Sequence, residues 1–272
     1  NAARFTQMNG CTPVADFDPA TCTLTVNRWI IGETARAGAE IVDALDGYRF
    51  NDAAHAAYQF AWHQFCDWYL EFTKPILQDG DATAEAEAEV RATTSWVLDQ
   101  ILKFLQPIMP FVTEELWRQL APTEGRSGML MLEAWPVFCD DLRAPDAEAE
   151  MDWVVRMVSE LRAVRSEMNV PPSAELPLSL TGASEATVRR LETNEGLLLR
   201  LARLSTITLS DNVPKRAVQV VVDETTAAMP IGEFIDVSQE VERLRKEIGK
   251  VDSEIGKIEK KLGNAGFIAN AP

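Results

Sequence analysis

The sequence predicts a mainly α fold, in which an antiparallel helical bundle is followed by a small α+β module and a long coiled-coil helix. Three observations predict it. Apolar residues recur at helical spacing through residues 1–120, short strand-like runs follow the prolines at 171–172, and a heptad pattern begins near residue 237. With 272 residues, 46% of them hydrophobic, the chain is long enough for one large or two ordinary domains.

The first two long helices are predicted from their periodicity and from their end signals. Residues 25–45 place apolar side chains at helical steps, and Gly47 lies just beyond the expected end. Asn51 is a candidate N-cap for the second helix, which Lys74 and Pro75 are expected to end. The second helix is expected to bury an aromatic seam formed by Tyr58, Trp62, Phe65, Tyr69 and Phe72.

A third helix over residues 83–105 and a short fourth helix complete the predicted bundle. The prolines of PIMP at 107–110 break the third helix, and Thr113 is expected to head the fourth. Short connections between amphipathic helices favour antiparallel neighbours. The apolar run MLMLEAWP at 129–136 is expected to be extended and to lie across the bundle.

The middle of the chain changes from helical to mixed patterns. A helix over 146–168 is expected to end at the prolines of VPP, and four short runs are predicted to be strands. Between the first strand and the others, two short helices are expected, capped by Ser184 and Asn194. These elements together predict a small α+β module with a mostly antiparallel sheet. The predicted strands are 175–180, 205–210, 217–223 and 227–231.

The last predicted element is a coiled-coil helix with a strict alternation of four- and three-residue steps. Charged residues of both signs fill the positions between, and a solvated face explains them without a ligand. An apolar seam of this length needs a covering helix, so self-association of the chain is one way to bury it. The seam consists of Val237, Val241, Leu244, Ile248, Val251, Ile255, Ile258 and Leu262.

Composition excludes several classes of protein. The net charge of −16 argues against a protein coated with basic surface, although the acids concentrate at 78–89 and 140–152. Four scattered cysteines and two histidines suggest neither a disulfide framework nor a metal site. Without a membrane-length apolar run or a signal pattern, we expect a soluble, cytoplasmic protein. The chain starts without methionine on an apolar pattern, so we expect a fragment.

No catalytic residue is predicted. His63, Cys66 and Asp67 share a helical face, yet a catalytic cysteine also needs a base and an oxyanion hole, and a metal needs further ligands. A buried cysteine beside a His63–Asp67 surface pair explains these residues better. Signatures such as GxxxxGK[ST], GxGxxG, GxSxG and HExxH do not occur in the sequence.

Two groups of residues are candidates for binding nucleic acid. Tyr48, Arg49 and Phe50 lie at a helix–helix corner, where aromatic rings are able to stack on unpaired bases. The alternative for Phe50 is a hydrophobic staple before the Asn51 cap, and we favour it. Arg162 and Arg165 lie one turn apart, which suits a phosphate or a neighbouring carboxylate equally well.

Several stretches together resemble the valyl-tRNA synthetases, which are class I aminoacyl-tRNA synthetases. NRWI, YRFNDAA, FCDWYLE and ILKFLQPIMPFVTEELW look like the anticodon-binding helical domain of that family. RAVRSEMNVPP and the heptad helix that ends in KLGNAGFIANAP look like its C-terminal region. FCDWYLE and PFVTEELW also fit the leucyl and isoleucyl relatives, whereas EMNVPP and the closing helix favour the valyl family.

The resemblance implies a tRNA-binding fragment of an enzyme that ligates valine to its tRNA. The family's catalytic and editing domains, with the HIGH and KMSKS signatures, precede the matched region, so this fragment is expected to be non-catalytic and to need no cofactor. The parent enzyme uses ATP and magnesium by resemblance. In the family, a coiled-coil hairpin leans on the tRNA elbow, which makes Lys246, Lys250 and Lys257 candidate contacts, and only its first helix is expected here.

The predicted domains are residues 1–140 for anticodon binding, 141–235 for the α+β module and 236–272 for the arm. The predicted partners are valine tRNA and the remaining domains of the parent chain, without a membrane. Two functional alternatives stay open: a structural or assembly module that pairs through the heptad helix, and a thiol enzyme built on Cys66.

Overall fold

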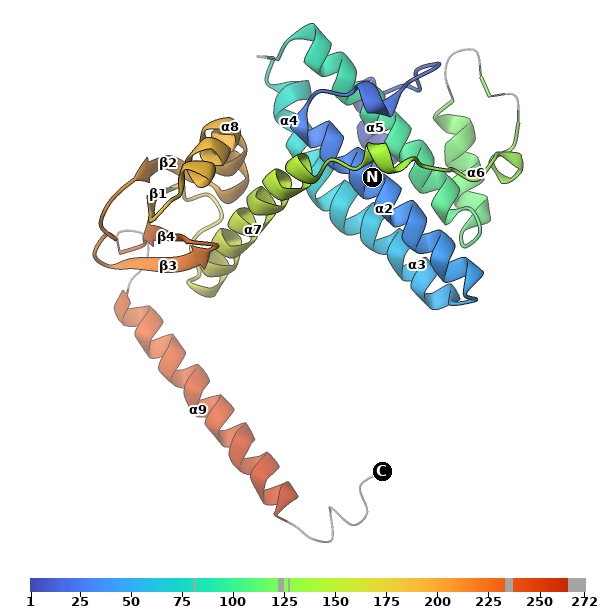
Figure 1. The fold of residues 1–272 in the computed structure, drawn as a ribbon. Coiled ribbons are helices and arrows are strands. Elements are labelled where there is room, and N and C mark those ends of the chain that lie inside the picture. Colours follow the sequence, from blue (N-terminus) through green and yellow to red (C-terminus); the bar gives the residue numbers. More distant parts are fainter. Residues whose placement is uncertain (81, 122–124, 127, 233–236, 264–272) are drawn as a thin grey trace. The chain divides into compact units, whose positions relative to one another are not determined.

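The computed structural model describes residues 1–80, 82–121, 125–126, 128–232 and 237–263 (Figure 1). The chain divides into two compact units, Asn1–Arg156 and Met157–Pro272, and the division falls within one helix. The first predicted domain boundary, at 140, stays a prediction, and the second lies among residues 233–236, outside the described residues.

The first unit is a helical bundle. Its helices are α1 (Ala2–Met8), α2 (Thr25–Asp46), α3 (Phe50–Tyr58), α4 (Leu70–Gln78), α5 (Ala84–Leu105) and α6 (Pro110–Gln119), and α7 (Pro145–Glu167) begins in it. Between α3 and α4 the chain forms a π-helix, η2 (Gln59–Tyr69). Short 3₁₀ turns occur at Pro19–Thr21, Leu130–Leu132 and Asp140–Leu142. The mainly α prediction is confirmed.

Helices α2 and α5 run in the same direction along the bundle. Near their starts, the Glu89 carboxylate accepts hydrogen bonds from the Leu24 backbone N–H, at 2.9 Å, and from Asn27. Near the end of α5, Phe104 lies with its ring centroid 6.2 Å from that of Phe60 in η2. The chain between them returns through α3, η2 and α4, so the α2–α3 corner and the α5–α6 corner emerge at the same end of the bundle, as Figure 1 shows.

Helix boundaries differ from the sequence prediction at three places. The second helix begins at Phe50 with Arg49 as its N-cap, so Asn51 lies inside the first turn. Pro75 lies inside α4, which continues to Gln78 although proline donates no hydrogen bond. Helix α6 begins at Pro110, which suits the first helical position, and Thr113 lies buried inside it.

The predicted aromatic seam is wrong at two positions. Phe65, Tyr69 and Phe72 are buried as expected, but Tyr58 is 50% exposed and Trp62 is 53% exposed. The π-helix explains the change, because its i→i+5 turns bring Phe60 and Phe65, five residues apart, onto the core side. A sequence pattern with helical 3.6 periodicity does not reveal that wider turn.

The second unit contains a four-stranded mixed sheet with the order β2-β1-β4-β3. Strand β1 (Leu176–Thr181) pairs parallel to β2 (Leu204–Leu209), and β4 (Thr225–Pro230) pairs antiparallel to β1 and to β3 (Ala217–Val222). Helix α8 (Glu185–Ala202) makes the crossover that a parallel pair requires. The predicted mostly antiparallel sheet is confirmed.

Helix α8 is one helix where the sequence suggested two. Ser184 caps its N-terminus, because its hydroxyl accepts a hydrogen bond from the Thr187 backbone N–H, as predicted. Asn194 does not cap a second helix. Its side chain donates to the Arg190 carbonyl at 2.9 Å, which lets the helix pass through without interruption.

Two other predictions concern extended and coiled-coil segments. The apolar run at 129–136 contains a 3₁₀ turn and no strand. Helix α9 (Val237–Leu262) forms as predicted, whereas its pairing in a coiled coil is not confirmed. The last predicted stretch, 264–272, lies outside the described residues. Within the described part of the chain, no helix has the length and apolar character that crossing a membrane requires.

Candidate nucleic-acid interface

The α2–α3 corner presents two aromatic rings to solvent. Tyr48 is 81% exposed and Phe50 is 64% exposed, and their ring centroids lie 6.4 Å apart in an edge-to-face arrangement. Phe50 is therefore not the hydrophobic staple that the sequence favoured, because a staple residue is packed against the helix. The exposed rings are available to a ligand.

Tyr48 adopts an unusual backbone conformation. Its φ is +57°, and the Tyr48 N–H donates to the Leu45 carbonyl while the Arg49 N–H donates to the Ala44 carbonyl. This is the Schellman pattern, in which glycine usually occupies the left-handed position. Here Gly47 lies one residue earlier, with φ at −81°, and a tyrosine occupies the costly position. Such strain at an exposed ring favours a functional explanation.

Arg49 is held by two carboxylates. Its guanidinium donates to Asp43 at 2.6 Å and to Asp52 at 3.1 Å. The hydrogen bond and the charge of Asp43, together with those of Asp52, raise the pKa of Arg49 further. Arg49 thus ties the end of α2 to the start of α3 and fixes the corner between the two rings.

The α5–α6 corner adds apolar side chains that the sequence analysis missed. Phe111 is 89% exposed, and Ile108, Met109 and Val112 are also exposed. Their signal in the sequence is an apolar run between and after the two prolines of a helix break. Both corners therefore present an aromatic and apolar surface, which we call the corner surface: Tyr48, Phe50, Ile108, Met109, Phe111 and Val112.

The cations beside the corner surface are engaged with protein groups. Arg126 pairs with Asp99 at 2.8 Å and lies 3.3 Å from the ring centroid of Trp117, which is a cation–π contact. Arg118 pairs with Glu115 at 2.7 Å. This end of the bundle therefore favours stacking over charge as its means of binding.

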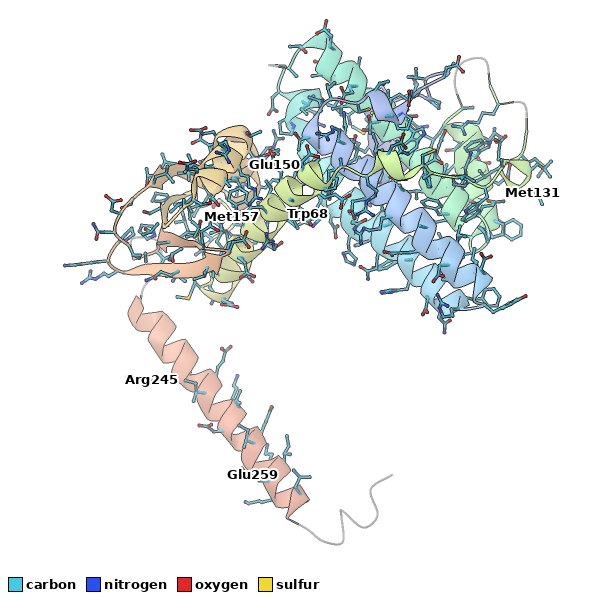
Figure 2. The ribbon with its side chains drawn as sticks, in the orientation of Figure 1. Trp68, Met131, Glu150, Met157, Arg245 and Glu259 are labelled. Carbon is cyan, nitrogen blue, oxygen red and sulfur yellow. The ribbon has the colours of Figure 1, made fainter. Side chains whose placement is uncertain are left out.

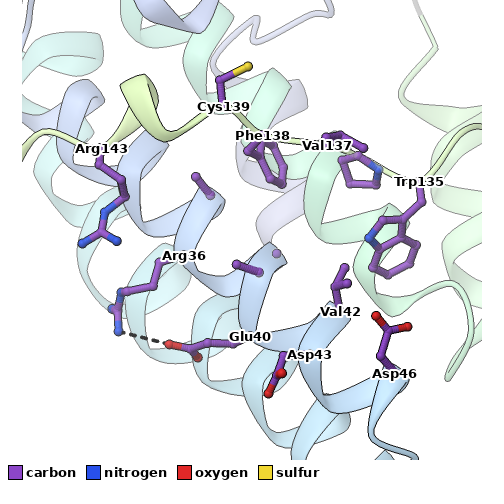
Figure 3. Close-up of a pocket in the computed structure, with 14 residues that line it drawn as sticks. Arg36, Glu40, Val42, Asp43, Asp46, Trp135, Val137, Phe138, Cys139 and Arg143 are labelled. Carbon is purple, nitrogen blue, oxygen red and sulfur yellow. Dashed lines mark ion pairs between the residues drawn. The ribbon is translucent and has the colours of Figure 1, made fainter.

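The first unit has two further hollows, and one of them adjoins the corner surface. One, of about 700 Å³, lies between α6 and the segment after it and is bordered by Phe111, Trp117 and Met129. The other, of about 650 Å³, lies between α2 and residues 135–143 (Figure 3). Figure 3 shows Arg36 paired with Glu40 there, and Arg143, Asp43 and Asp46 also line it. Since Arg143 is paired with Glu148, the carboxylates of this hollow disfavour a phosphate.

The predicted arginine pair of the second unit serves the fold. Arg165 is 7% exposed, and its guanidinium donates to the backbone carbonyls of Arg203, Pro171 and Ala174. Arg162 donates from Nε to the Leu201 carbonyl at 2.9 Å. Burial lowers the pKa of Arg165, and the positive charge of Arg203 lowers it further. We therefore leave Arg165 out of the proposed RNA-binding surface.

The thiol centre at Cys66 lacks the features of a nucleophile. Burial raises the pKa of the Cys66 thiol, and the charge of Asp67 raises it further, whereas a reactive cysteine needs a lowered pKa. His63 Nδ1 lies 3.0 Å from Asp67, which is the surface pair expected from the sequence. Among the described residues, no three or more histidine, cysteine and acidic side chains are grouped to hold a metal ion.

Comparison with known protein families decides the family of the bundle. Residues 27–180 match the anticodon-binding domain of tRNA ligase, which is more than half of the chain. The chain belongs to this family. The corner surface is therefore a feature of an anticodon-binding domain. Residues 236–272, which include α9, match the valyl tRNA synthetase tRNA binding arm.

Similar curated proteins are called valine–tRNA ligases. The protein of Caulobacter vibrioides is 48% identical over 272 residues, that of Mesorhizobium japonicum 47% over 274 residues, and that of Brucella suis 46% over 273 residues. Each alignment covers 100% of this chain and 29–30% of the relative. The chain thus spans about 30% of the length of the relatives that it matches.

Outside the anticodon-binding domain, α9 carries lysines on one face, and its described acidic residues lie with Arg245 beside the apolar seam. Lys246, Lys250 and Lys257 are exposed, and with Gly249 and Gly256 they occupy the face opposite the apolar seam. Acidic residues such as Glu259, labelled in Figure 2, lie beside the seam. Five described seam residues are about half exposed or more: Ile248, Val251, Ile255, Ile258 and Leu262.

Proposed function

We propose that the chain is the C-terminal tRNA-binding part of a valine–tRNA ligase and that the corner surface receives the anticodon loop. The family match and the similarity to valine–tRNA ligases support the first part. The observation that carries the second is Tyr48, whose exposed ring is held at a backbone conformation that glycine would adopt at lower cost. Unpaired bases stack on such rings.

The proposed interface joins two kinds of contact. Stacking on the corner surface provides recognition of splayed bases, and cationic side chains elsewhere contact phosphate. On α9, Lys246, Lys250 and Lys257 form the proposed phosphate-contacting face, because the acids lie toward the seam instead. Specificity for valine tRNA and the role of the parent enzyme, which would use ATP and magnesium in the cytoplasm, belong to the same proposal. The chain itself is proposed to be non-catalytic.

Binding of an anticodon stem-loop RNA from valine tRNA to the full chain tests the corner surface. Tyr48→Gly is the most informative variant, since it removes the ring and relieves the backbone strain. We expect it to stabilise the bundle by about 1 kcal/mol while weakening RNA binding roughly tenfold. Opposite signs for stability and affinity separate a binding role from a structural one.

Two further variants complete this experiment. Phe50→Ala is expected to weaken binding by a similar factor, whereas Met8→Ala, which shortens a side chain that is 75% exposed on α1, should leave affinity unchanged. Fluorescence anisotropy with labelled RNA measures all of them at one salt concentration, because phosphate contacts depend on salt. Unchanged affinity in both corner variants would remove the anticodon assignment.

An assembly role is a second candidate function. The five exposed apolar side chains of the α9 seam favour pairing with another helix, because a coiled-coil helix buries such residues. Sedimentation of the full chain over a concentration series tests self-association. A monomer throughout the series would leave tRNA binding as the only function proposed for this chain.

A further inference from the structure

The outer face of α3 and η2 carries aromatic and neutral polar side chains. Exposed positions recur along it in helical steps at Asn51, His55, Tyr58, Gln59, Trp62 and His63. We call this set the outer face. It begins at the α2–α3 corner and includes both histidines of the chain.

The π-helix is what places Trp62 on the outer face. In η2 the rings of Phe60 and Phe65, five residues apart, are buried in the core. Trp62 lies between them in the chain and projects to solvent beside Tyr58. The Tyr58 and Trp62 rings are stacked, with centroids 6.2 Å apart and planes inclined by 12°. Wide turns of this kind are uncommon and occur often at functional sites. Two large exposed rings held parallel form a stacking platform.

The carboxylates around the outer face have partners. Asp52 and Asp43 are paired with Arg49, and Asp67 is paired with His63. Glu40, which borders the same hollow as His55 and Gln59, is paired with Arg36. The His63 ring also packs edge-on against Tyr58, with centroids 5.6 Å apart. In a chain of net charge −16, a face of aromatic, amide and imidazole groups is suited to a nucleic-acid strand.

We propose that the Tyr58–Trp62 platform stacks on a second unpaired base of the same RNA strand whose anticodon base lies on the corner surface. This inference rests on the proposed function. The interface then binds a run of unpaired nucleotides along the helix, with Phe50 at one end and the aromatic platform at the other.

The spacing fixes how far apart the two bases lie. Tyr58 follows Phe50 by eight residues, which is about 12 Å along an α-helix. Stacked nucleotides advance about 3.4 Å each along a strand. The base on the platform is therefore expected about three to four nucleotides from the base on Phe50, which fits within one unpaired loop.

A double-mutant cycle between protein and RNA tests the platform. The probes are the valine tRNA anticodon stem-loop and versions of it with one abasic loop nucleotide at a time, measured by anisotropy with the full chain. We expect Trp62→Ala to weaken binding of the intact stem-loop roughly tenfold. At one loop position, removal of the base should lower the affinity of the unsubstituted chain by a similar factor. The same removal should change the affinity of the Trp62→Ala variant little. Tyr58→Ala should behave alike, and Met8→Ala should not.

The outcomes separate this inference from the proposed function. The cycles support the platform and the anticodon assignment together if Phe50→Ala is energetically coupled to the base at one loop position and Trp62→Ala to the base at another, three or four nucleotides away. Coupling of Phe50 alone overturns the platform and leaves the anticodon assignment intact, whereas absence of stem-loop binding removes both. If Trp62→Ala changes the sedimentation of the chain but no RNA affinity, the platform is a protein contact and the inference is wrong. Circular dichroism verifies that each variant is folded.

Discussion

Replacing Glu89 by alanine is expected to destabilise the helical unit by about 3 kcal/mol. The Glu89 carboxylate accepts hydrogen bonds from the backbone and hydroxyl of Thr23, from the Leu24 backbone N–H and from the Asn27 amide. The two bonds to Thr23 are exposed, and water replaces them on mutation. The bonds to Leu24 and Asn27 are partly buried, and each hydrogen bond to a charged group contributes ~1.5 kcal/mol or more.

Tryptophan fluorescence during urea or thermal unfolding measures this effect in one unit. All seven tryptophans lie between Trp29 and Trp153, so the signal reports the first unit without contribution from the second. For a unit of this size, 3 kcal/mol corresponds to a fall in melting temperature of about 6–12 °C. Glu89→Gln keeps the shape of the side chain and should cost roughly half as much, because only part of the acceptor set is lost.

The pH dependence gives the same prediction a second readout. Burial raises the pKa of Glu89, but the hydrogen bonds from Asn27, Leu24 and Thr23 outweigh it and lower the pKa below 4.5. A lowered pKa in the folded state means that the stabilisation is complete above the unfolded pKa, near pH 4.5, and is lost as pH falls below it. The difference in the free energy of unfolding between the unsubstituted chain and Glu89→Gln should therefore shrink on acidification. A gap below 0.5 kcal/mol at pH 7, or one that grows on acidification, would refute the reasoning.

Three other predictions follow from the packing. Gly38→Ala should lower the stability of the first unit by about 1–3 kcal/mol, measured by the same fluorescence, since a Cβ there would lie 2.6 Å from the Phe138 ring; unchanged stability would contradict that packing. Arg165→Met should increase hydrogen exchange in the β-sheet of the second unit, because three carbonyls lose the guanidinium as a donor; unchanged exchange would mean that these hydrogen bonds of Arg165 do not stabilise the sheet. Cys139, which is exposed, should be alkylated before Cys22, whose burial raises its pKa to about 11; mass spectrometry gives the order, and the reverse order would contradict it.

The sequence predicted the elements of this fold better than the faces that they bury. Periodicity located α2, α5, α7 and α9 within one or two residues, because their apolar positions follow the regular helical step. It failed at Trp62 and Tyr58, since a π-helix changes the step without a signal in the pattern. It also split α8 at Asn194, whose side chain bonds within the helix instead of capping a new one.

The candidate site was predicted in part. The corner with Tyr48, Arg49 and Phe50 was identified from residue type and position, but the positive φ of Tyr48 has no sequence signature when a glycine stands next to it. Phe111 was missed because its exposure depends on where α6 begins. Arg165 could not be assigned to backbone carbonyls, since its partners are the Arg203 carbonyl, 38 residues away in the chain, and carbonyls of the irregular segment that follows α7.

The central claim is that this chain recognises the anticodon of valine tRNA through the corner surface. Its most direct test compares the affinity of the full chain for valine tRNA with its affinity for the same tRNA carrying a different anticodon, at moderate salt. We predict clearly weaker binding of the anticodon-swapped tRNA, by roughly tenfold for each base-edge contact that is lost, because stacking itself tolerates any base. Equal affinity for the two tRNAs would contradict the claim.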